Sequence, residues 1–298
     1  MSRRRRPLPG APEGGLVIDK PAGMTSHDVV AGVRRALGQP RVGHAGTLDP
    51  MATGVLPLLL GRATRLAQFV SSADKTYLAT VRFGQATSTY DAEGDPVGPA
   101  SRVTLERQTL ERLLEGFRGR QVQSPPAVSA KRVGGTRAYV LARSTPDLQL
   151  PPVPVEVHAL TLVGLGGADA QLRLDVSAGY YVRSLAHDLG VALGTGAHLV
   201  ALTRERSGQF TLGQAVPLRE VLEAPAAAVP RVMAPVELLP GFPRVVVDAT
   251  AAAQIAHGRP VEGPVAAAGR ACLVGPDGRL LALAECRGRL LHPFLVLV

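Results

Sequence analysis

Residues 75–84 alternate between apolar and polar side chains, and this pattern constrains the fold more than any other in the chain. The apolar residues occupy every second position: Tyr77, Ala79, Val81 and Phe83. Successive side chains of a strand point to opposite faces, so the alternation predicts a strand with one buried face. Shorter patterns predict further strands at 155–163, 172–176 and 199–204. The chain is therefore expected to build a sheet from segments that are far apart in sequence.

Two segments have the spacing of an amphipathic helix instead. Thr25 and Asp28 resemble a capping box, and the apolar residues that follow share one helical face as far as Leu37. A second helix is expected at 105–117, where leucines recur at helical spacing. The remaining expected elements are short: strands at 16–18 and 55–60, a helix at 63–70, and a loop at 85–99.

Residues 43–54 form the most distinctive segment chemically. Three glycines and two alanines among these twelve residues leave the backbone open to close approach by a partner. Pro50 disfavours the helical conformation at Asp49, which would hold that carboxylate in an extended, defined pose. An Asp-Pro turn or a helix N-cap would use the same aspartate without any chemistry. The residues by themselves leave both interpretations open.

Two other segments carry candidate binding groups. Tyr181 and Arg183 are two residues apart on a segment expected to be extended, so their side chains would project to the same side. They can line one pocket, although a surface pair would have the same spacing. The segment 124–154 is rich in proline and contains Lys131 and Arg132. An insertion of this size is expected to do more than connect two elements, for example by closing over a ligand.

Composition divides the chain into four parts. Residues 1–14 include four consecutive arginines and are expected to form a basic disordered tail. Residues 15–223 hold the candidate site and form the main domain. Alanine and proline dominate residues 224–243, which is typical of a linker. Residues 244–298 contain a hairpin pattern around 275–278 and predict a small β-rich domain.

The chain is strongly basic, and its charge comes almost entirely from arginine. The formal net charge is +9, and 30 of the 33 basic residues are arginine. The planar guanidinium suits phosphate and stacks on bases, so a nucleic acid is the natural partner. The base composition of a genome would also give many arginines and few lysines. The charge therefore favours a nucleic-acid partner and leaves this alternative open.

Several classes of chemistry lack their usual motifs in this sequence. It has no P-loop, no Gly-x-Gly-x-x-Gly after a strand, and no Gly-x-Ser-x-Gly. The seven histidines and two cysteines do not fall at metal-ligand spacings, so neither a metal nor a nucleotide cofactor is expected. Its apolar runs are too short to cross a bilayer, and the cysteine count fits a reducing cytosol. The expected location is the cytoplasm, with no membrane partner.

Five blocks of the sequence, taken in order, resemble the TruB family of tRNA pseudouridine synthases. They lie at 20–26, 43–54, 74–77, 179–185 and 196–210. The resemblance spans residues 15 to about 215, and residues 244–298 are similar, more weakly, to a PUA-type RNA-binding domain. It implies an α+β pseudouridine-synthase fold with a large mixed, mainly antiparallel sheet and a central catalytic cleft. This architecture is an expectation from the family more than from the periodicity.

The resemblance implies isomerisation of the uridine at position 55, in the T-arm loop of tRNA. The N1 glycosidic bond breaks, the uracil turns, and C5 becomes attached to C1′, so no cofactor is needed. The nucleotide must first be flipped into a pocket, at a cost of roughly a few kcal/mol. Asp49 would then attack C1′ or remove the 2′ proton, and the sequence does not separate these routes. The family's partner for this aspartate is Arg183, a cation that would keep a desolvated carboxylate ionised.

The resemblance also assigns roles to residues around the aspartate. Tyr77 would stack on the uracil and help to take the proton from C5, which makes it a catalytic residue beside Asp49 and Arg183, and His44 would fill the space that the flipped base leaves. The remaining assignments are a pocket wall from Tyr181 and Leu202, support of the loop or RNA contacts from Lys20 and Arg204, and an RNA grip from segment 124–154 with Lys131 and Arg132. Each has an ordinary structural alternative, such as a core role for Tyr77 and Leu202 or a turn lysine at Lys20.

Two departures from the family pattern concern RNA binding. Residues 129–132 read Ser-Ala-Lys-Arg where relatives often have a hydrophobic residue before a single lysine, and Thr203 stands where arginine is frequent. Two other functions also remain open. One is a tRNA-binding or tRNA-folding protein without catalysis, which the charge favours. The other is a guide-dependent enzyme that acts on ribosomal RNA. A monomer is expected in each case.

Overall fold

A computed structural model describes residues 10–129, 132–133, 136–137, 141, 145, 150–263 and 269–298. Its largest element is one sheet of ten strands. The strands are β1 Gly14–Lys20, β2 Val42–His44, β3 Thr53–Leu60, β4 Lys75–Phe83, β7 Gly119–Gln123, β10 Val153–Gly166, β11 Asp169–Val176, β12 Ala197–Ser207, β13 Phe210–Thr211 and β14 Val216–Pro217. Their order is β14-β1-β3-β12-β4-β11-β10-β7, with β2 beside β3 and β13 beside β12.

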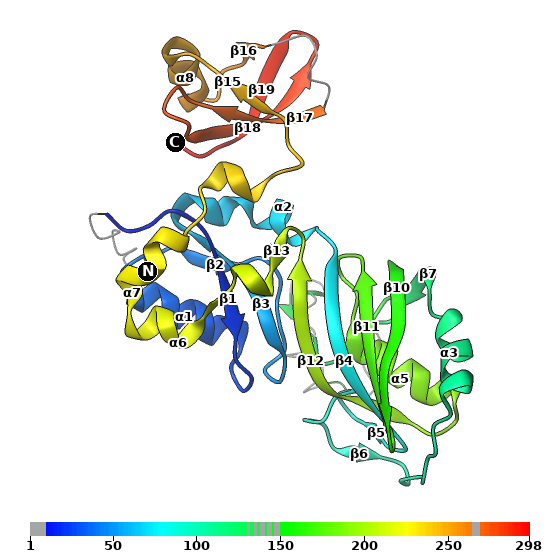
Figure 1. The fold of residues 1–298 in the computed structure, drawn as a ribbon. Coiled ribbons are helices and arrows are strands. Elements are labelled where there is room, and N and C mark those ends of the chain that lie inside the picture. The colour runs from blue at the N-terminus through cyan, green and yellow to red at the C-terminus, as the bar shows by residue number, and fades with distance from the viewer. Residues whose placement is uncertain are drawn as a thin grey trace.

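The sheet is mixed and mainly antiparallel, as expected (Figure 1). Only β1 with β14 and β3 with β12 pair in parallel, and the other neighbouring strands of this sheet are antiparallel. The parallel contact between β3 and β12 joins two halves of the domain. The loop of residues 43–54, which runs from β2 into β3, therefore lies beside the strand that carries Leu202 and Arg204.

Strand β4 lies between β12 and β11 and places Tyr77 at the centre of the domain. Tyr77 is opposite Arg204 on β12 and Leu174 on β11. The side chains of its apolar face are at most 8% exposed, and those of its other face are more exposed. The alternation of residues 75–84 predicted this strand correctly, because each apolar residue faces the core.

Helices pack against both halves of the sheet (Figure 1). They are α1 Ser26–Ala36, α2 Ala67–Ser71, α3 Arg107–Glu115, α5 Val182–Ala192, α6 Leu218–Glu223 and α7 Pro225–Ala228, with a 3₁₀ segment η1 at Gly61–Leu66. Helix α1 packs against α6 and β2, and α5 packs against β12 and β4. The capping box is confirmed, because Asp28 N donates to Thr25 Oγ1 at 3.1 Å and Thr25 N donates to Asp28 Oδ2 at 3.0 Å.

Two expectations of local structure are wrong in part. The segment 85–99 contains the strands β5 Ala86–Thr87 and β6 Pro96–Val97, which pair with each other and are too short to produce a visible alternation. Arg183 lies in the first turn of α5 and not on an extended segment. The reason is a tertiary contact: Gln123 accepts a hydrogen bond from Tyr181 N at 2.8 Å and donates to its carbonyl at 3.0 Å, so the extended backbone ends at Tyr181.

Residues 224–243, expected to be a linker, contain α7 and two 3₁₀ segments, η3 Val229–Arg231 and η4 Pro235–Leu238. Proline at the start of each suits a helical first turn, where no backbone N–H is needed. Met233 exchanges two backbone hydrogen bonds with Gly15 on β1, at 2.8 and 2.9 Å. Val236, Leu238 and Leu239 are buried. The segment therefore packs along the main domain.

The C-terminal residues build a separate five-stranded sheet (Figure 1). Its elements are β15 Arg244–Val246, α8 Ala249–Ala256, β16 Val261–Glu262, β17 Gly269–Val274, β18 Leu280–Arg287 and β19 Leu290–Val296. The strand order is β15-β17-β18-β19-β16. The predicted hairpin is confirmed, because β17 and β18 are antiparallel neighbours joined through 275–278. The expected small β-rich C-terminal domain is therefore present.

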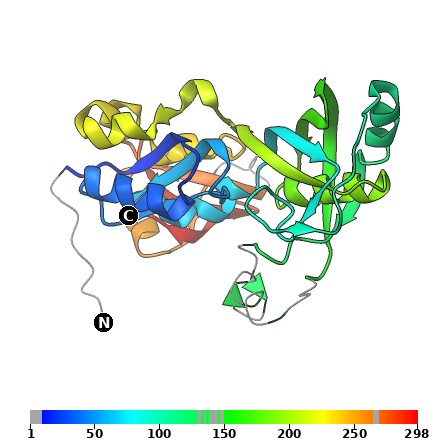
Figure 2. The same ribbon diagram turned by 90° about the horizontal axis from the view of Figure 1, so that it is seen from below.

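This C-terminal sheet packs directly on the main domain. Both parts contribute to one buried cluster, which includes Val17, Val55, Leu66, Leu283 and Leu297. Arg62 Nη1 donates to the carbonyl of Leu297 at 2.9 Å, and Arg65 donates to the carbonyl of Val296. Seen from below, the orange and red C-terminal strands lie behind the blue N-terminal elements (Figure 2). The two parts thus share a core.

Most of the expected basic tail lies outside the described residues. Residues 1–9 lie outside the described residues, and β1 begins at Gly14, the last residue of the expected tail. None of the helices in the described part of the chain is long and apolar enough to cross a membrane.

Candidate active site

The glycines of the loop 43–54 are required by its close contact with β12. Gly54 has a φ of +95°, and a Cβ at this position would lie 2.4 Å from the carbonyl oxygen of Arg204. Gly46 has a φ of +112° and faces the Arg204 guanidinium. Residues with a side chain rarely adopt such angles, so glycine allows the loop to turn against the strand. Asp49 lies at the tip between these two glycines.

Three buried polar side chains hold the backbone of the loop 43–54 through hydrogen bonds. Arg204, which is 1% exposed, donates to the carbonyls of Val55 at 2.7 Å, Gly46 at 3.1 Å and Thr47 at 3.3 Å. Lys20 is fully buried and its Nζ donates to the carbonyls of Pro50 at 3.1 Å and Pro21 at 2.8 Å. Burial lowers the pKa of Lys20 to about 8, opposed by the nearby Asp49 charge.

Ser26, from the first turn of α1, completes this support. Its hydroxyl accepts a hydrogen bond from Leu48 N at 2.9 Å and contacts the carbonyl of Leu48 at 3.1 Å. Backbone groups that would otherwise be unpaired are therefore satisfied on both sides of Asp49. The loop is fixed by buried hydrogen bonds, and Asp49 is free to use its carboxylate elsewhere.

The Asp49 carboxylate forms an ion pair with Arg183. Arg183 Nη2 donates to Asp49 Oδ1 at 3.2 Å, and Arg183 Nε lies 3.0 Å from Oδ2 at an angle that does not make a hydrogen bond. The Asp49 side chain is 34% exposed, whereas that of Arg183 is 6% exposed. The carboxylate therefore has one face on a buried cation and the other open. It caps no helix, so the N-cap alternative is wrong.

Asp91 is a second acidic partner of Arg183, and the sequence analysis missed it. Its Oδ2 lies 3.3 Å from Arg183 Nη1, and its side chain is 5% exposed. Arg183 also donates to the carbonyls of Thr89 at 3.2 Å and Val128 at 2.9 Å. A buried guanidinium needs such compensation, because an unpaired buried charge costs several kcal/mol. Asp91 lies in the polar segment 85–99, where nothing distinguishes it from a solvated turn acid.

A pocket opens beside the carboxylate. Its volume is about 320 Å³, and it is lined by residues 46–49, 71, 75, 77, 177, 179–183, 202 and 204. This size lies at the lower end of the range for small-ligand sites. Six of the residues predicted from the sequence line it: Asp49, Tyr77, Tyr181, Arg183, Leu202 and Arg204.

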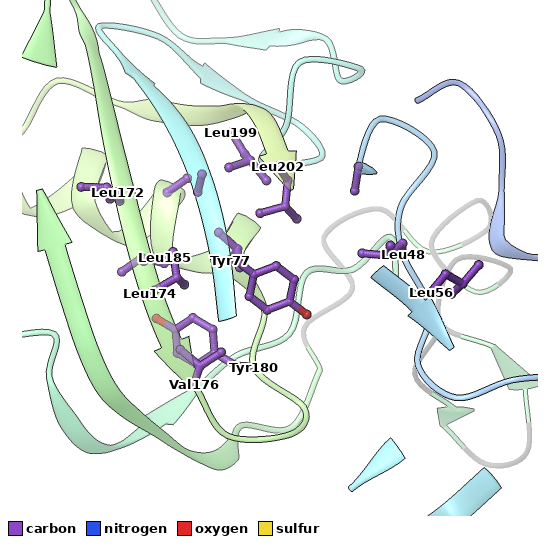
Figure 3. Close-up of a cluster of buried hydrophobic side chains, with 14 of the residues drawn as sticks. Leu48, Leu56, Tyr77, Leu172, Leu174, Val176, Tyr180, Leu185, Leu199 and Leu202 are labelled. Atoms are coloured by element: carbon purple, nitrogen blue, oxygen red, sulfur yellow. The ribbon is translucent and has the colours of Figure 1, made fainter. Parts of the chain in front are cut away.

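Apolar side chains form the wall of the pocket opposite the loop (Figure 3). Tyr77 projects from the end of β4 with Leu202 and Tyr180 on either side, and Leu48 faces it from the loop. Tyr77 and Leu202 are 8% and 7% exposed, so each is both a core residue and a lining residue. For these two residues the core interpretation and the pocket interpretation are therefore both correct.

Three ionisable groups of the lining, Lys75, Tyr180 and Tyr181, have a pKa shifted by burial. Burial lowers the pKa of Lys75 to about 8, and its Nζ donates to the carbonyls of Ser71 and Ala73, both at 2.5 Å. Burial raises the pKa of the Tyr180 and Tyr181 hydroxyls. At neutral pH the lysine is therefore mainly charged, and both tyrosines are neutral. Lys75 is not among the site residues predicted from the sequence, although it begins the same alternating strand as Tyr77.

The other predicted site residues lie outside the pocket lining. His44 ends β2, at the beginning of the loop 43–54, and its ring makes an edge contact with His27 at 5.4 Å between centroids. Lys20 lies beneath the loop. Lys131 is outside the described residues, and Arg132 is described only as part of the two-residue strand β8 Arg132–Val133, which pairs with β9 Thr136–Arg137. Within the described part of the chain, no cluster of acids, histidines and cysteines can hold a metal.

Comparison with known proteins decides the family. Residues 34–182 match the family described as "TruB family pseudouridylate synthase (N terminal domain)". Residues 183–239 match "tRNA pseudouridylate synthase B C-terminal domain", and residues 242–298 match "tRNA Pseudouridine synthase II, C terminal". The chain belongs to the TruB family. It is therefore a pseudouridine synthase, an isomerase, and the resemblance seen in the five sequence blocks is confirmed.

Curated relatives and solved structures agree with this assignment. A protein of Solibacter usitatus named "tRNA pseudouridine synthase B" is 54% identical over 250 residues, which is 83% of this chain and 85% of that protein. The namesake from Thermobifida fusca is 43% identical over 292 residues, covering 95% and 98%. A chain from "Crystal Structure of a Cbf5-Nop10-Gar1 Complex" is 25% identical, with a TM-score of 0.75 and coverage of 98% and 88%. The pseudouridine-synthase fold is thus confirmed over nearly the whole chain.

Proposed function

We propose that this TruB family member converts the uridine at position 55 of tRNA to pseudouridine, with Asp49 acting at C1′ of a flipped nucleotide. The observation that carries the proposal is the Asp49 carboxylate, held against Arg183 and open to a pocket. The relatives named tRNA pseudouridine synthase B support tRNA as the substrate. The net charge of +9 suits a polyanionic partner.

The reaction needs the uridine to leave its stack, because its glycosidic bond is out of reach inside a folded loop. The pocket of about 320 Å³ offers room for a uracil with part of its ribose. Tyr77 lines this pocket and would stack on the uracil, while Tyr181 and Leu202 would bound the base at its sides. His44, at the end of β2, would occupy the space that the base leaves in the RNA.

The chemistry is a balanced rearrangement within one nucleotide. The N1–C1′ bond breaks, the uracil rotates in the pocket, and C5 forms a bond to C1′. C5 then loses its proton and N1 carries one, so the product has the same atoms and oxidation state as the substrate. Asp49 would either attack C1′ and leave again or remove the 2′ proton. Either route uses an ionised carboxylate, which the Arg183 charge favours.

The remaining predicted residues would act through position or through RNA contacts. Lys20 and Arg204 hold the backbone of the catalytic loop, and their contacts support a positioning role for both. Lys131 and Arg132, with the segment 124–154, would grip the RNA backbone. Residues 244–298 would extend the RNA contact as a PUA-like domain. The reaction requires no cofactor, and we expect the enzyme to work as a cytoplasmic monomer.

The substitution Asp49→Asn tests this proposal. Asparagine keeps the size of the side chain but removes its charge, so pseudouridine formation on an unmodified tRNA transcript should fall by about 10³-fold or more. Asp169→Asn is the matched control, since Asp169 also pairs with an arginine, at 2.7 Å, and its side chain is 33% exposed, but it lies at the start of β11 and does not line the pocket. Pseudouridine mapping would show the modified position. Near-normal turnover of the Asp49→Asn variant would disprove the catalytic role.

The same variant separates the alternatives. A protein that only binds or refolds tRNA would keep that ability after Asp49→Asn, and the unsubstituted chain would make no pseudouridine. A guide-dependent enzyme for ribosomal RNA would fail on tRNA without guide RNA and partner proteins. Modification of tRNA position 55 by the purified chain alone supports the proposed function over both. Light scattering of the same preparation checks the monomer.

A further inference from the structure

Tyr90 has an unusual backbone conformation next to the candidate active site. Its φ is +65°, and it is the one non-glycine residue with positive φ among the described residues. Such a conformation costs a residue with a side chain roughly 1–2 kcal/mol. Hydrogen bonds hold it in place: Tyr90 N donates to the carbonyl of Thr87 at 3.2 Å, and Leu199 N donates to the carbonyl of Tyr90 at 3.0 Å. Glycine or asparagine would fit this turn more easily, so the tyrosine side chain needs its own explanation.

The Tyr90 ring stacks on His187. The ring centroids are 4.0 Å apart and the planes differ by 18°. His187 lies on α5, four residues after Arg183, so both side chains leave the same face of that helix. Burial raises the pKa of the Tyr90 hydroxyl, so the stacked ring stays neutral. The stack thus connects the turn that follows β5 to the helix that carries Arg183.

The two neighbours of Tyr90 contact the Arg183 guanidinium itself. The Thr89 carbonyl accepts from Arg183 Nη1 at 3.2 Å, and Asp91 Oδ2 lies 3.3 Å from the same nitrogen. Asp91 is in turn fixed by Thr89 Oγ1, which donates to its Oδ1 at 2.5 Å, and by Glu93 N at 3.1 Å. The turn is therefore attached to one face of α5 at two points, one helical turn apart. One attachment is the ring stack, and the other is the guanidinium.

We propose that Tyr90 and His187 are positioning residues that fix the turn against α5, so that Thr89 and Asp91 hold the Arg183 guanidinium in register with Asp49. Neither ring lines the pocket, so neither is expected to touch the substrate. The inference rests on the proposed catalytic role of Asp49 and Arg183. A simple packing role would not require the strained φ, which places the residues before and after Tyr90 on the same nitrogen of Arg183.

Three single variants and one double variant test this arrangement. Tyr90→Phe keeps the ring and should retain kcat within about twofold. Tyr90→Gly relieves the backbone strain but removes the ring, so kcat should fall by about tenfold or more with little change in KM, because small misplacements of a catalytic group are costly. His187→Ala removes the other ring and should give a similar fall in kcat. The double variant Tyr90→Gly with His187→Ala should be no slower than either single variant, because both remove the same contact.

Thermal unfolding provides the readout that separates positioning from folding. Tyr90→Gly should unfold at or near the temperature of the unsubstituted chain, since glycine accepts the positive φ. A normal kcat for Tyr90→Gly, a fall in kcat that follows a loss of folded protein, or independent effects in the double variant would overturn the proposal. Asp49→Asn is assayed alongside. An active Asp49→Asn variant would defeat the proposed function, whereas an inactive one beside a normal Tyr90→Gly would defeat only the positioning role.

Discussion

At the scale of single residues, the charge of Arg183 is shared between two aspartates with different exposure. Asp49 is one-third exposed and faces the pocket, whereas Asp91 is buried and contacts the opposite side of the guanidinium. In the proposed reaction, an arginine held by one buried carboxylate would remain fixed while the other carboxylate acts. The arrangement leaves Asp49 paired with a cation and open to the pocket at the same time. It also gives Asp91 a role that is independent of substrate contact.

Asp91→Asn should therefore slow the reaction without removing its chemistry. Asparagine can still accept from Thr89 and Glu93, but it no longer neutralises Arg183, whose position becomes less well determined. We expect kcat to fall by about ten- to a hundredfold, with little change in KM for tRNA. Single-turnover kinetics with the Asp169→Asn control measure this. An unchanged kcat would show that Thr89 and Val128 suffice to hold the guanidinium.

The sequence predicted the candidate residues that a local pattern marks and missed those whose contacts form only in the folded chain. Asp49 stands in a glycine-rich loop before a proline, and Tyr77 lies in a regular alternation of apolar and polar residues. Both can therefore be recognised from the sequence alone. Asp91 and His187 contact their partners only after β5, β12 and α5 have come together. No spacing rule connects residue 91 to residue 183. The positive φ of Tyr90 is equally invisible, because the local sequence does not require it.

At the scale of elements, the loop 43–54 depends on glycine at its junction with β12. Gly54→Ala would place a Cβ 2.4 Å from the Arg204 carbonyl at a φ of +95°. The loop must then move away from the strand that clamps it, so we expect a loss of stability of about 1–3 kcal/mol and a strong loss of activity. Gly98→Ala is the control, because Gly98 has a φ of +73° with nothing within 4 Å of the added carbon.

Urea unfolding and the tRNA assay check this pair of variants together. Backbone strain alone should affect both variants to a similar extent, and steric conflict should affect only Gly54→Ala. Gly98→Ala should therefore keep its activity while losing some stability. Equal losses of activity in the two variants would contradict the idea that close contact with Arg204 requires glycine at residue 54.

The two buried lysines, Lys20 and Lys75, make the free energy of unfolding depend on pH. Burial lowers the pKa of both Lys20 and Lys75 to about 8, from 10.5 in the unfolded chain. Below pH 8 the folded and the unfolded chain both keep these protons, so the lysines do not make the free energy of unfolding change with pH. Between pH 8 and about 10 the unfolded chain keeps protons that the folded chain has released, so their contribution to the free energy of unfolding rises with pH.

Each lysine should contribute up to about 1.4 kcal/mol per pH unit in this window. Urea unfolding at about pH 7.5, 8.5 and 9.5 measures the slope. Lys75→Met should reduce it, because methionine has no proton to release. Two buried groups should oppose this trend, Cys272 from about pH 9, because burial raises its thiol pKa to about 11, and Tyr180 above pH 10, because burial raises its pKa; in both cases the unfolded chain loses the proton first. A slope that Lys75→Met leaves unchanged would contradict the assignment.

The sequence predicted long elements better than short ones. The strands predicted at 75–84, 172–176 and 199–204 follow from alternation, and α1 follows from its capping box. The strands β5 and β6 were not predicted, because a strand of two residues is too short to show an alternation. The start of α5 depends on Gln123, which lies 58 residues away from Tyr181 in the chain. Such a contact belongs to the tertiary structure, so local pattern could not locate the first turn of the helix.

At the scale of the whole molecule, the C-terminal sheet is coupled to the pocket through α2. Phe69 on α2 packs against Phe242 at 5.8 Å and Phe294 at 6.0 Å between ring centroids, and the Arg270 guanidinium lies over Phe69 and Phe294. Helix α2 ends at Ser71, whose carbonyl accepts from Lys75, and both line the pocket. Composition predicted that residues 244–298 form an independent unit. The core that they share with the main domain was not predicted, because its residues come from segments far apart in the sequence.

Two leucines in this sheet test the coupling, because both are fully buried but face different cores. Leu283 on β18 belongs to the cluster shared with the main domain, and Leu273 on β17 belongs to the cluster confined to the C-terminal part. Truncation to alanine at either position should cost about 2–5 kcal/mol of stability. Only Leu283→Ala removes packing beside α2, so only it should speed hydrogen exchange across η1 and α2 and lower kcat through Ser71 and Lys75. Leu273→Ala should leave exchange in these helices unchanged. If the two variants gave the same exchange pattern and the same kcat, the C-terminal sheet would act on RNA binding alone, and the shared core would serve only to hold the two parts together.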